Sequence, residues 1–188
     1  IIEEVKSELP ELPDDKKERF QKEYSLSPYD SNILVSEIEI ADFFEAVTKG
    51  RDPKIAANWI TGEFFAAMNK LGFNIVDSPI TIDNLSKLIK LIEENVISTR
   101  IAKDVFEIML ENNEDPEEIV EREGLKQVSD SAELEKIIDN IIANNPDQVE
   151  AVKLKPKLMG WFVGQVMKET NGKANPKLVN DLLSDKLN

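Results

Sequence analysis

The side chains of this sequence that could do chemistry are carboxylates and lysines. None of its 188 residues is Cys or His, which excludes disulfides, thiolate or imidazole metal sites, and Ser-His or Cys-His nucleophile pairs. Carboxylates alone could still bind Mg²⁺ or Ca²⁺. The acids, however, are spread over the exposed faces expected of helices, which is weak support for acid/base catalysis. We therefore expect no catalytic residue and no metal-binding residue.

The densest group of carboxylates lies between Glu111 and Glu123, where seven acids accompany one base, Arg122. A divalent-cation site could be imagined there. The acids are dispersed over turn and helix positions, so we interpret the group as a solvated charge run. Pro116 should begin a short helix in this run and Gly124 should end it.

Lysines gather near the C-terminus. The whole chain carries a net charge of −14, yet residues 151–188 contain seven lysines and three acids and so carry +4, whereas the remaining residues hold 16 bases and 34 acids. A basic end on an acidic body can meet phosphate locally, although the net charge argues against nonspecific nucleic-acid binding by the whole surface. The candidate RNA-binding residues are Lys153, Lys155, Lys157, Lys168, Lys173 and Lys177. For any single one of them, the plainer interpretation is that it solubilises an acidic protein.

The elements that must position these lysines can be read from the same stretch. The apolar spacing predicts a helix over Leu158–Lys168. Gly160 and Gly164 lie one turn apart on it and should each cost roughly 1 kcal/mol relative to Ala, so we expect a close backbone approach at this face. Asn171 and Gly172 should end the helix.

A second helix should follow over residues 177–187. Asn175 is its expected N-cap and Pro176 its first helical position. Lys177 then lies in the first turn, where backbone amides also favour an anion.

The rest of the chain predicts an all-α protein, a helical bundle followed by a small helical tail. Two Leu-Pro steps favour an extended segment over residues 1–13, and Asp14 or Asp15 should cap the first helix. Residues 54–71 form the longest amphipathic pattern of the first part of the chain. The aromatic residues Trp59, Phe64 and Phe65 in that pattern could stack on bases, but their helical spacing favours core packing.

A boundary is expected at residues 124–130, with Ser131 capping the next helix. This gives an extended linker over residues 1–13, a helical linker domain over 14–124 and a tail over 125–188. No apolar run approaches the ~18 residues needed to span a membrane.

The tail carries a specific motif, Gly160 with Gly164-Gln-Val-Met-Lys168 and Gly172-Lys-Ala-Asn-Pro176. With this motif, the chain resembles the B subunits of the aspartyl/glutamyl-tRNA amidotransferases, the GatB/YqeY family. The resemblance covers nearly the whole chain. Its further matches are Pro10–Pro13, Arg19-Phe20, Ala56–Trp59, Ile101–Phe106, Asp115–Ile119 and Gly124–Val128.

The resemblance implies a C-terminal fragment, which a first residue of Ile1 instead of Met would fit. In the whole enzyme, the B subunit phosphorylates the side-chain carboxylate of Glu-tRNA(Gln) or Asp-tRNA(Asn), and ammonia released from glutamine in the A subunit replaces the phosphate. This ATP-dependent ligase site, with its ATP and Mg²⁺, belongs to a large N-terminal domain that is absent here. The fragment itself should therefore lack the active site and need no cofactor.

The resemblance also implies partners and location. The expected partners are tRNA, held by its outer corner on the tail, and the A and C subunits, with no DNA and no membrane. The expected location is the cytoplasm of a bacterium, or an organelle. A competing interpretation from a different class is an acidic helical module that docks proteins and binds no nucleic acid. The net charge favours that alternative, whereas the basic tail and the motif favour RNA.

Overall fold

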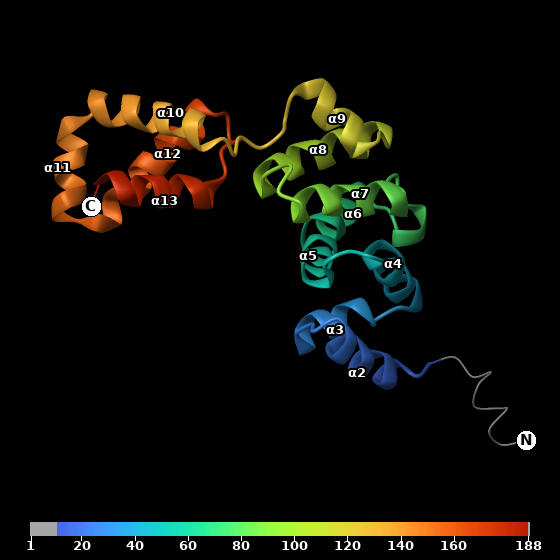
Figure 1. Ribbon diagram of the computed structural model, residues 1–188. Coiled ribbons are helices and arrows are strands. Elements are labelled where there is room, and N and C mark those ends of the chain that lie inside the picture. The colour runs from blue at the N-terminus through green and yellow to red at the C-terminus, as the bar shows by residue number, and fades with distance from the viewer. Residues whose placement is uncertain (1–10, 188) are drawn as a thin grey trace, which may run out of the picture. The chain divides into compact units, whose positions relative to one another are not determined.

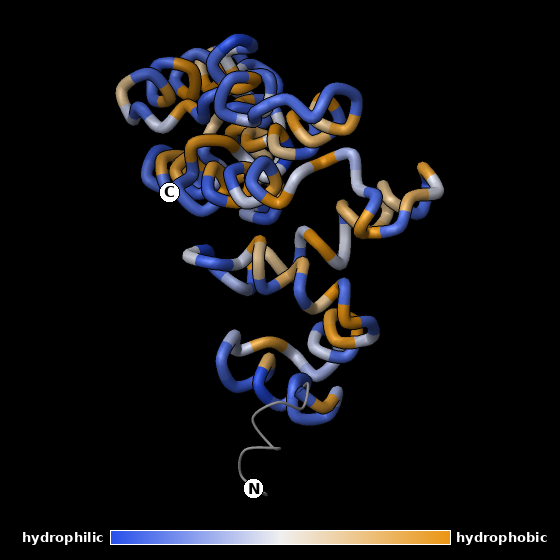
Figure 2. Tube along the Cα trace, turned by 90° about the vertical axis from the view of Figure 1, so that its right-hand side faces the viewer, coloured by the Kyte–Doolittle hydropathy of each residue, from blue (hydrophilic) through white to orange (hydrophobic). Residues whose placement is uncertain are grey.

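The computed structural model describes residues 11–187 and confirms the all-α prediction. Over this range the chain forms helices and one isolated parallel β-bridge, between Val128 and Ala174, but no strand. Along the helices, apolar residues recur among polar ones (Figure 2), and most of the recurring apolar positions are buried. The chain divides into two compact units, one containing residues up to 93 with 109–113, the other containing residues 94–108 with the chain from 114 onward.

The first unit is built from short helices in succession (Figure 1). They are α2 (Pro13–Glu23), α3 (Pro28–Leu34), α4 (Ile38–Thr48), α5 (Pro53–Trp59), the π-helical turn η1 (Ile60–Phe64), α6 (Phe65–Leu71), the 3-10 turn η2 (Ile75–Asp77) and α7 (Ile82–Glu93). Helix α8 (Thr99–Asn112) adds its last residues to this unit. Aromatic rings pack the helices together: Phe20, Tyr24 and Phe44 lie 5.3 Å apart between ring centroids, and Phe43 stacks on Phe64 at 4.9 Å.

The burial of Trp59, Phe64 and Phe65 decides between the two roles considered for them, core packing and base stacking. Trp59 and Phe64 are buried and Phe65 is half-buried, so the prediction of core packing is confirmed. The pattern over residues 54–71 is one helical stretch, but a π-helical turn interrupts it. Gly72 ends the stretch in the left-handed conformation, with a φ of 72°.

The start of the first helix differs from the prediction. Neither Asp14 nor Asp15 is the N-cap. Leu12 is extended and occupies that position without a side-chain hydrogen bond, while Pro13 begins α2. Both aspartates then fall in the first helical turn, where the helix dipole favours acids. Of the extended segment expected over residues 1–13, residues 1–10 lie outside the described part of the chain.

The second unit contains the first residues of α8 together with α9 (Pro116–Glu123), α10 (Ser131–Asn144), α11 (Pro146–Leu154), the 3-10 turn η3 (Pro156–Leu158), α12 (Met159–Glu169) and α13 (Pro176–Leu187). Helices α10, α12 and α13 pack on one another, and α11 lies across one end of this group (Figure 1). Ser131 is the first residue of α10 and not its cap, because Asp130 accepts the hydrogen bonds from the amides of Ala132 and Glu133.

Candidate nucleic-acid interface

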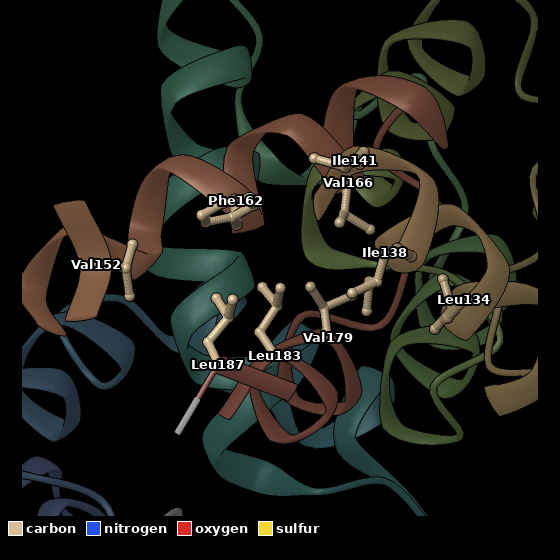
Figure 3. Packing of buried hydrophobic residues seen from close by; sticks show 10 residues of the cluster. Leu134, Ile138, Ile141, Val152, Phe162, Val166, Val179, Leu183 and Leu187 are labelled. Atoms are coloured by element: carbon tan, nitrogen blue, oxygen red, sulfur yellow. The ribbon is translucent and has the colours of Figure 1, made fainter. Parts of the chain in front are cut away.

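The helices that carry the predicted lysines rest on a separate apolar core (Figure 3). Phe162 and Val166 of α12 point toward Val179 and Leu183 of α13, and Ile138 of α10 closes the group. The first four of these side chains have no solvent exposure. Burial fixes the rotation of α12 and α13 about their axes, and this decides which of their residues face solvent.

Three of the predicted lysines flank the turn between α11 and α12. Lys153 forms an ion pair with Glu150 at 3.0 Å. Lys155 has an extended backbone, with φ −139° and ψ 90°, and Lys157 lies in the 3-10 turn that follows. All three are exposed. Because the Lys153 ammonium already has a carboxylate partner, Lys155 and Lys157 are the better placed to meet an anion.

The glycines of α12 do not have the contact that we expected. A Cβ at Gly160 or Gly164 would meet no described atom within 4 Å outside its own helix turn, and both positions are exposed. The predicted close approach to another part of the chain is therefore wrong for residues 11–187. The reason is that Phe162 and Val166 turn α12 toward the core and leave the glycines on its outer side.

Lysine accompanies the two glycines on this outer side. Lys168 follows Gly164 by four residues, which places it on the same helix face, and it is exposed. At the other end, Lys157 lies in the 3-10 turn, two residues before α12 begins. We call Lys157, Gly160, Gly164 and Lys168 the glycine–lysine face. Between residues 11 and 187, no acid pairs with either of these lysines or with Lys155 and Lys177.

The turn after α12 is held by hydrogen bonds. Asn171 and Gly172 adopt positive φ values of 52° and 78°, confirming the predicted helix stop. The amide of Gly172 donates to the carbonyl of Met167 at 2.7 Å. The hydroxyl of Thr170 accepts the amide of Ala174 at 3.2 Å. Lys173 is half-buried in this turn, and its carbonyl accepts the amide of Val128 at 2.7 Å.

The start of α13 is capped as predicted. The side-chain oxygen of Asn175 accepts the amides of Lys177 and Leu178 at 3.1 and 3.3 Å, and Pro176 is the first helical residue. These two amides are thus already used by the cap, so they do not offer an anion the free donors that we expected. Lys177 is exposed and contributes its ammonium only.

Two residues far away in the sequence complete this turn. Ser98 caps the first turn of α8 by accepting the amide of Ile101 at 3.2 Å, and its hydroxyl donates to the carbonyl of Gly172 at 3.1 Å. The guanidinium of Arg100 lies over Gly172, where a Cβ would be 3.0 Å from Nη1. Sequence reasoning missed Arg100 as a base beside the tail, because local patterns carry no signal for a contact across 72 positions.

Two findings concern metals and membranes. In the described part of the chain, no three acidic side chains are placed to hold a metal ion together. In the acidic run, Asp115 caps α9, Glu114 pairs with Arg122, and Glu121 pairs with Lys126.

No helix over residues 11–187 combines the length and apolar character that crossing a membrane requires.

Comparison with known proteins finds the same family by domain pattern and by whole-chain similarity. The sequence pattern of the GatB domain (GatB/YqeY) matches residues 42–187. The chain is 55% identical over 187 residues to the B subunit of the aspartyl/glutamyl-tRNA(Asn/Gln) amidotransferase of Rhizobium meliloti. It is 52% identical to the corresponding protein of Azorhizobium caulinodans and 53% identical to that of Rhodospirillum rubrum. Each match covers the whole of this chain but only 37–39% of the relative's length.

The domain match extends from α4 to the last helix and so includes the glycine–lysine face, the capped turn and the core beneath them. The chain belongs to the GatB/YqeY family.

Proposed function

We propose that this chain is the tRNA-holding part of the B subunit of a glutamine-dependent tRNA amidotransferase. The relatives are named as the B subunit of an aspartyl/glutamyl-tRNA(Asn/Gln) amidotransferase. In this proposal the whole enzyme converts Glu-tRNA(Gln), Asp-tRNA(Asn) or both to the amidated forms. The ATP- and Mg²⁺-dependent chemistry takes place on a catalytic part that precedes this chain, and the A and C subunits supply ammonia and complete the assembly, in the cytoplasm.

The single observation that carries the RNA contact is the glycine–lysine face. Gly160 and Gly164 expose helix backbone without side chains, so a phosphodiester backbone can approach α12 closely. Lys157 and Lys168 at the two ends, with Lys155 nearby in the sequence, supply positive charges that no acid among residues 11–187 pairs with. A-form RNA is read by shape and by phosphate contacts. We therefore expect binding that depends on charge and on the tRNA fold, and not on base sequence.

The experiment is a tRNA titration of the 188-residue chain at several salt concentrations. Replacing Lys155, Lys157 and Lys168 with Ala should weaken binding and reduce the slope of log K against log salt by about 2–3, because each phosphate contact contributes roughly 0.7–0.9 to that slope. The matched control replaces three exposed lysines of the first unit, Lys49, Lys54 and Lys70, with Ala, which changes the net charge equally. None of the three pairs with an acid among residues 11–187.

The two triple variants also separate the competing function. If both bind tRNA like the unchanged chain, or if the unchanged chain ignores tRNA at low salt, the RNA contact is wrong. The acidic protein-docking module would then be the better account of the tail. If both triples weaken binding equally, the effect is net charge alone and the glycine–lysine face is not the site.

A further inference from the structure

The first unit carries a second exposed surface. Its polar residues are acidic, whereas those of the glycine–lysine face are basic. An open hollow of about 420 Å³ lies between α4, α6 and η2. Its apolar wall is made of Ile40, Phe65, Met68, Phe73, Ile75 and Val76.

Large apolar side chains stand open at this hollow. Val76 is 70% exposed and Phe73 is 43% exposed. The turn η2, which carries Ile75 and Val76, has no buried residue at all. Ile38, which lies between Glu37 and Glu39 in the sequence, is 58% exposed but does not line the hollow. Soluble proteins rarely leave apolar side chains gathered in this way without a binding role.

The polar part of the lining is acidic. Glu37, the N-cap of α4, and Glu39 in its first turn line the hollow. Among residues 11–187 neither carboxylate has an ion-pair partner. The helix dipole accounts for acids at this end of α4, but it does not account for the exposed apolar residues beside them. The combination selects a ligand that is apolar at its centre and positive at its edge.

We infer that this hollow docks a segment of another protein, one that carries an aliphatic or aromatic side chain next to Lys or Arg. The apolar side chain enters the hollow against Phe73 and Val76, and the cation pairs with Glu37 or Glu39. RNA is disfavoured because two carboxylates would face its phosphates. A small molecule is disfavoured because the hollow is open and Val76 in its wall is 70% exposed, so a larger partner is needed to cover it. A second copy of this chain is disfavoured by mutual repulsion, since each copy carries −14. The hollow would act in this way whether or not the tail binds RNA.

The experiment selects peptides from a random phage-displayed library on the full 188-residue chain. The selected peptides should contain an apolar residue next to Lys or Arg. Val76→Lys should weaken their binding by at least roughly tenfold in a fluorescence-anisotropy titration, because it fills the hollow with a positive charge. The tail variant Lys155→Ala/Lys157→Ala should bind these peptides unchanged, which separates this site from the RNA site.

Charge reversal distinguishes docking from a loss of folding. With Glu37→Lys/Glu39→Lys as the bait, the library should yield peptides with Asp or Glu beside the apolar residue. The matched control is Asp14→Lys/Asp15→Lys, which makes the same change in the first turn of α2 and should still select basic peptides. Three results would each overturn the inference: peptides without a basic residue, peptides indifferent to Val76→Lys, or self-association of the chain that Glu37→Lys/Glu39→Lys abolishes. The last of these would assign the hollow to a second copy of this chain.

Discussion

At the scale of single residues, the three glycines of the tail motif differ in what a side chain would cost. Gly160 and Gly164 lie in a helix with open space around them, whereas Gly172 has a φ of 78° and Arg100 beside it. Replacing Gly160 or Gly164 with Ala should therefore stabilise the protein by up to about 1 kcal/mol each. Gly172→Ala should destabilise it by about 1 kcal/mol or more, because L residues are strained at positive φ.

Urea unfolding combined with the tRNA titration checks both halves of this prediction. If RNA lies on the glycine–lysine face, Gly160→Ala and Gly164→Ala should weaken tRNA binding while the protein itself becomes more stable. A loss of stability at Gly160 or Gly164 would instead mean that this helix face packs on something. A variant that is more stable yet binds tRNA more weakly cannot owe the weaker binding to misfolding.

A second residue-scale prediction concerns Arg19 and pH. Its guanidinium donates to Glu11 at 2.7 and 2.8 Å and to Glu45 at 2.5 Å. The hydrogen bond from Arg19 is the main cause that lowers the pKa of both carboxyls below the ordinary 4.5, and the hydroxyl of Tyr24 adds a further bond to Glu45. The folded pKa values lie below the unfolded ones. The stabilisation is therefore complete above the ordinary pKa and is lost as the pH falls through the lowered values.

Arg19→Met should accordingly destabilise the first unit at neutral pH and flatten the loss of stability as the pH falls below the ordinary carboxyl pKa of 4.5. Chemical unfolding followed by the fluorescence of Trp59, in a Trp161→Phe background and at several pH values, would measure this. The control is Lys22→Met, because Lys22 pairs with Glu18 on an exposed surface at 3.2 Å, where ion pairs contribute little. Equal pH profiles for the two variants would contradict the role of Arg19.

At the scale of elements, two serines cap helices in the same way but have different further contacts. Ser27 caps α3 by accepting the amide of Asp30 at 3.0 Å, on the surface. Ser98 is buried, caps α8, and also donates to the carbonyl of Gly172. Ser27→Ala should cost about 1 kcal/mol, whereas Ser98→Ala should cost about 2 kcal/mol or more, since a buried carbonyl then loses its donor. Urea midpoints compare the two, and equal losses would show that the bond to Gly172 contributes nothing.

Ser98 also illustrates which features could be predicted from the sequence and which could not. Helix ends marked by local chemistry, such as Asn175-Pro176, Gly172 and Gly124, were predictable, because the groups that decide them lie within a few residues. The bond from Ser98 to Gly172 and the position of Arg100 depend on the tertiary fold. The π-helical turn at Ile60–Phe64 leaves no trace in the apolar pattern. At Gly160 and Gly164 the residue type did indicate that something unusual was needed, but it could not indicate whether a neighbour or open space meets them.

At the scale of the whole molecule, the apolar core beneath the lysines is drawn entirely from residues 128–187. The piece 125–188, the tail expected from the sequence, should therefore fold alone and keep the RNA contact, because all six predicted lysines lie within it. The compact second unit, however, also includes residues 94–108. The segment 94–108 supplies the bond from Ser98 to Gly172, the carbonyl of Val96 that accepts the amide of Gln127 at 2.6 Å, and the guanidinium over Gly172.

The longer piece 94–188 should therefore be more stable than 125–188 by about 1–3 kcal/mol, since each recovered hydrogen bond contributes roughly 1 kcal/mol. Circular dichroism during urea unfolding would measure the difference. Introducing Ser98→Ala into the longer piece should remove part of the gain, and in both pieces the tRNA affinity should stay the same.

If 125–188 is unfolded, the boundary near residue 124 is wrong and α8 is part of the tail domain. If the two pieces are equally stable, the contacts of Ser98 and Arg100 only orient the turn. The stability of the tail and its binding surface thus depend on different residues, and the two pieces allow each to be measured without the other.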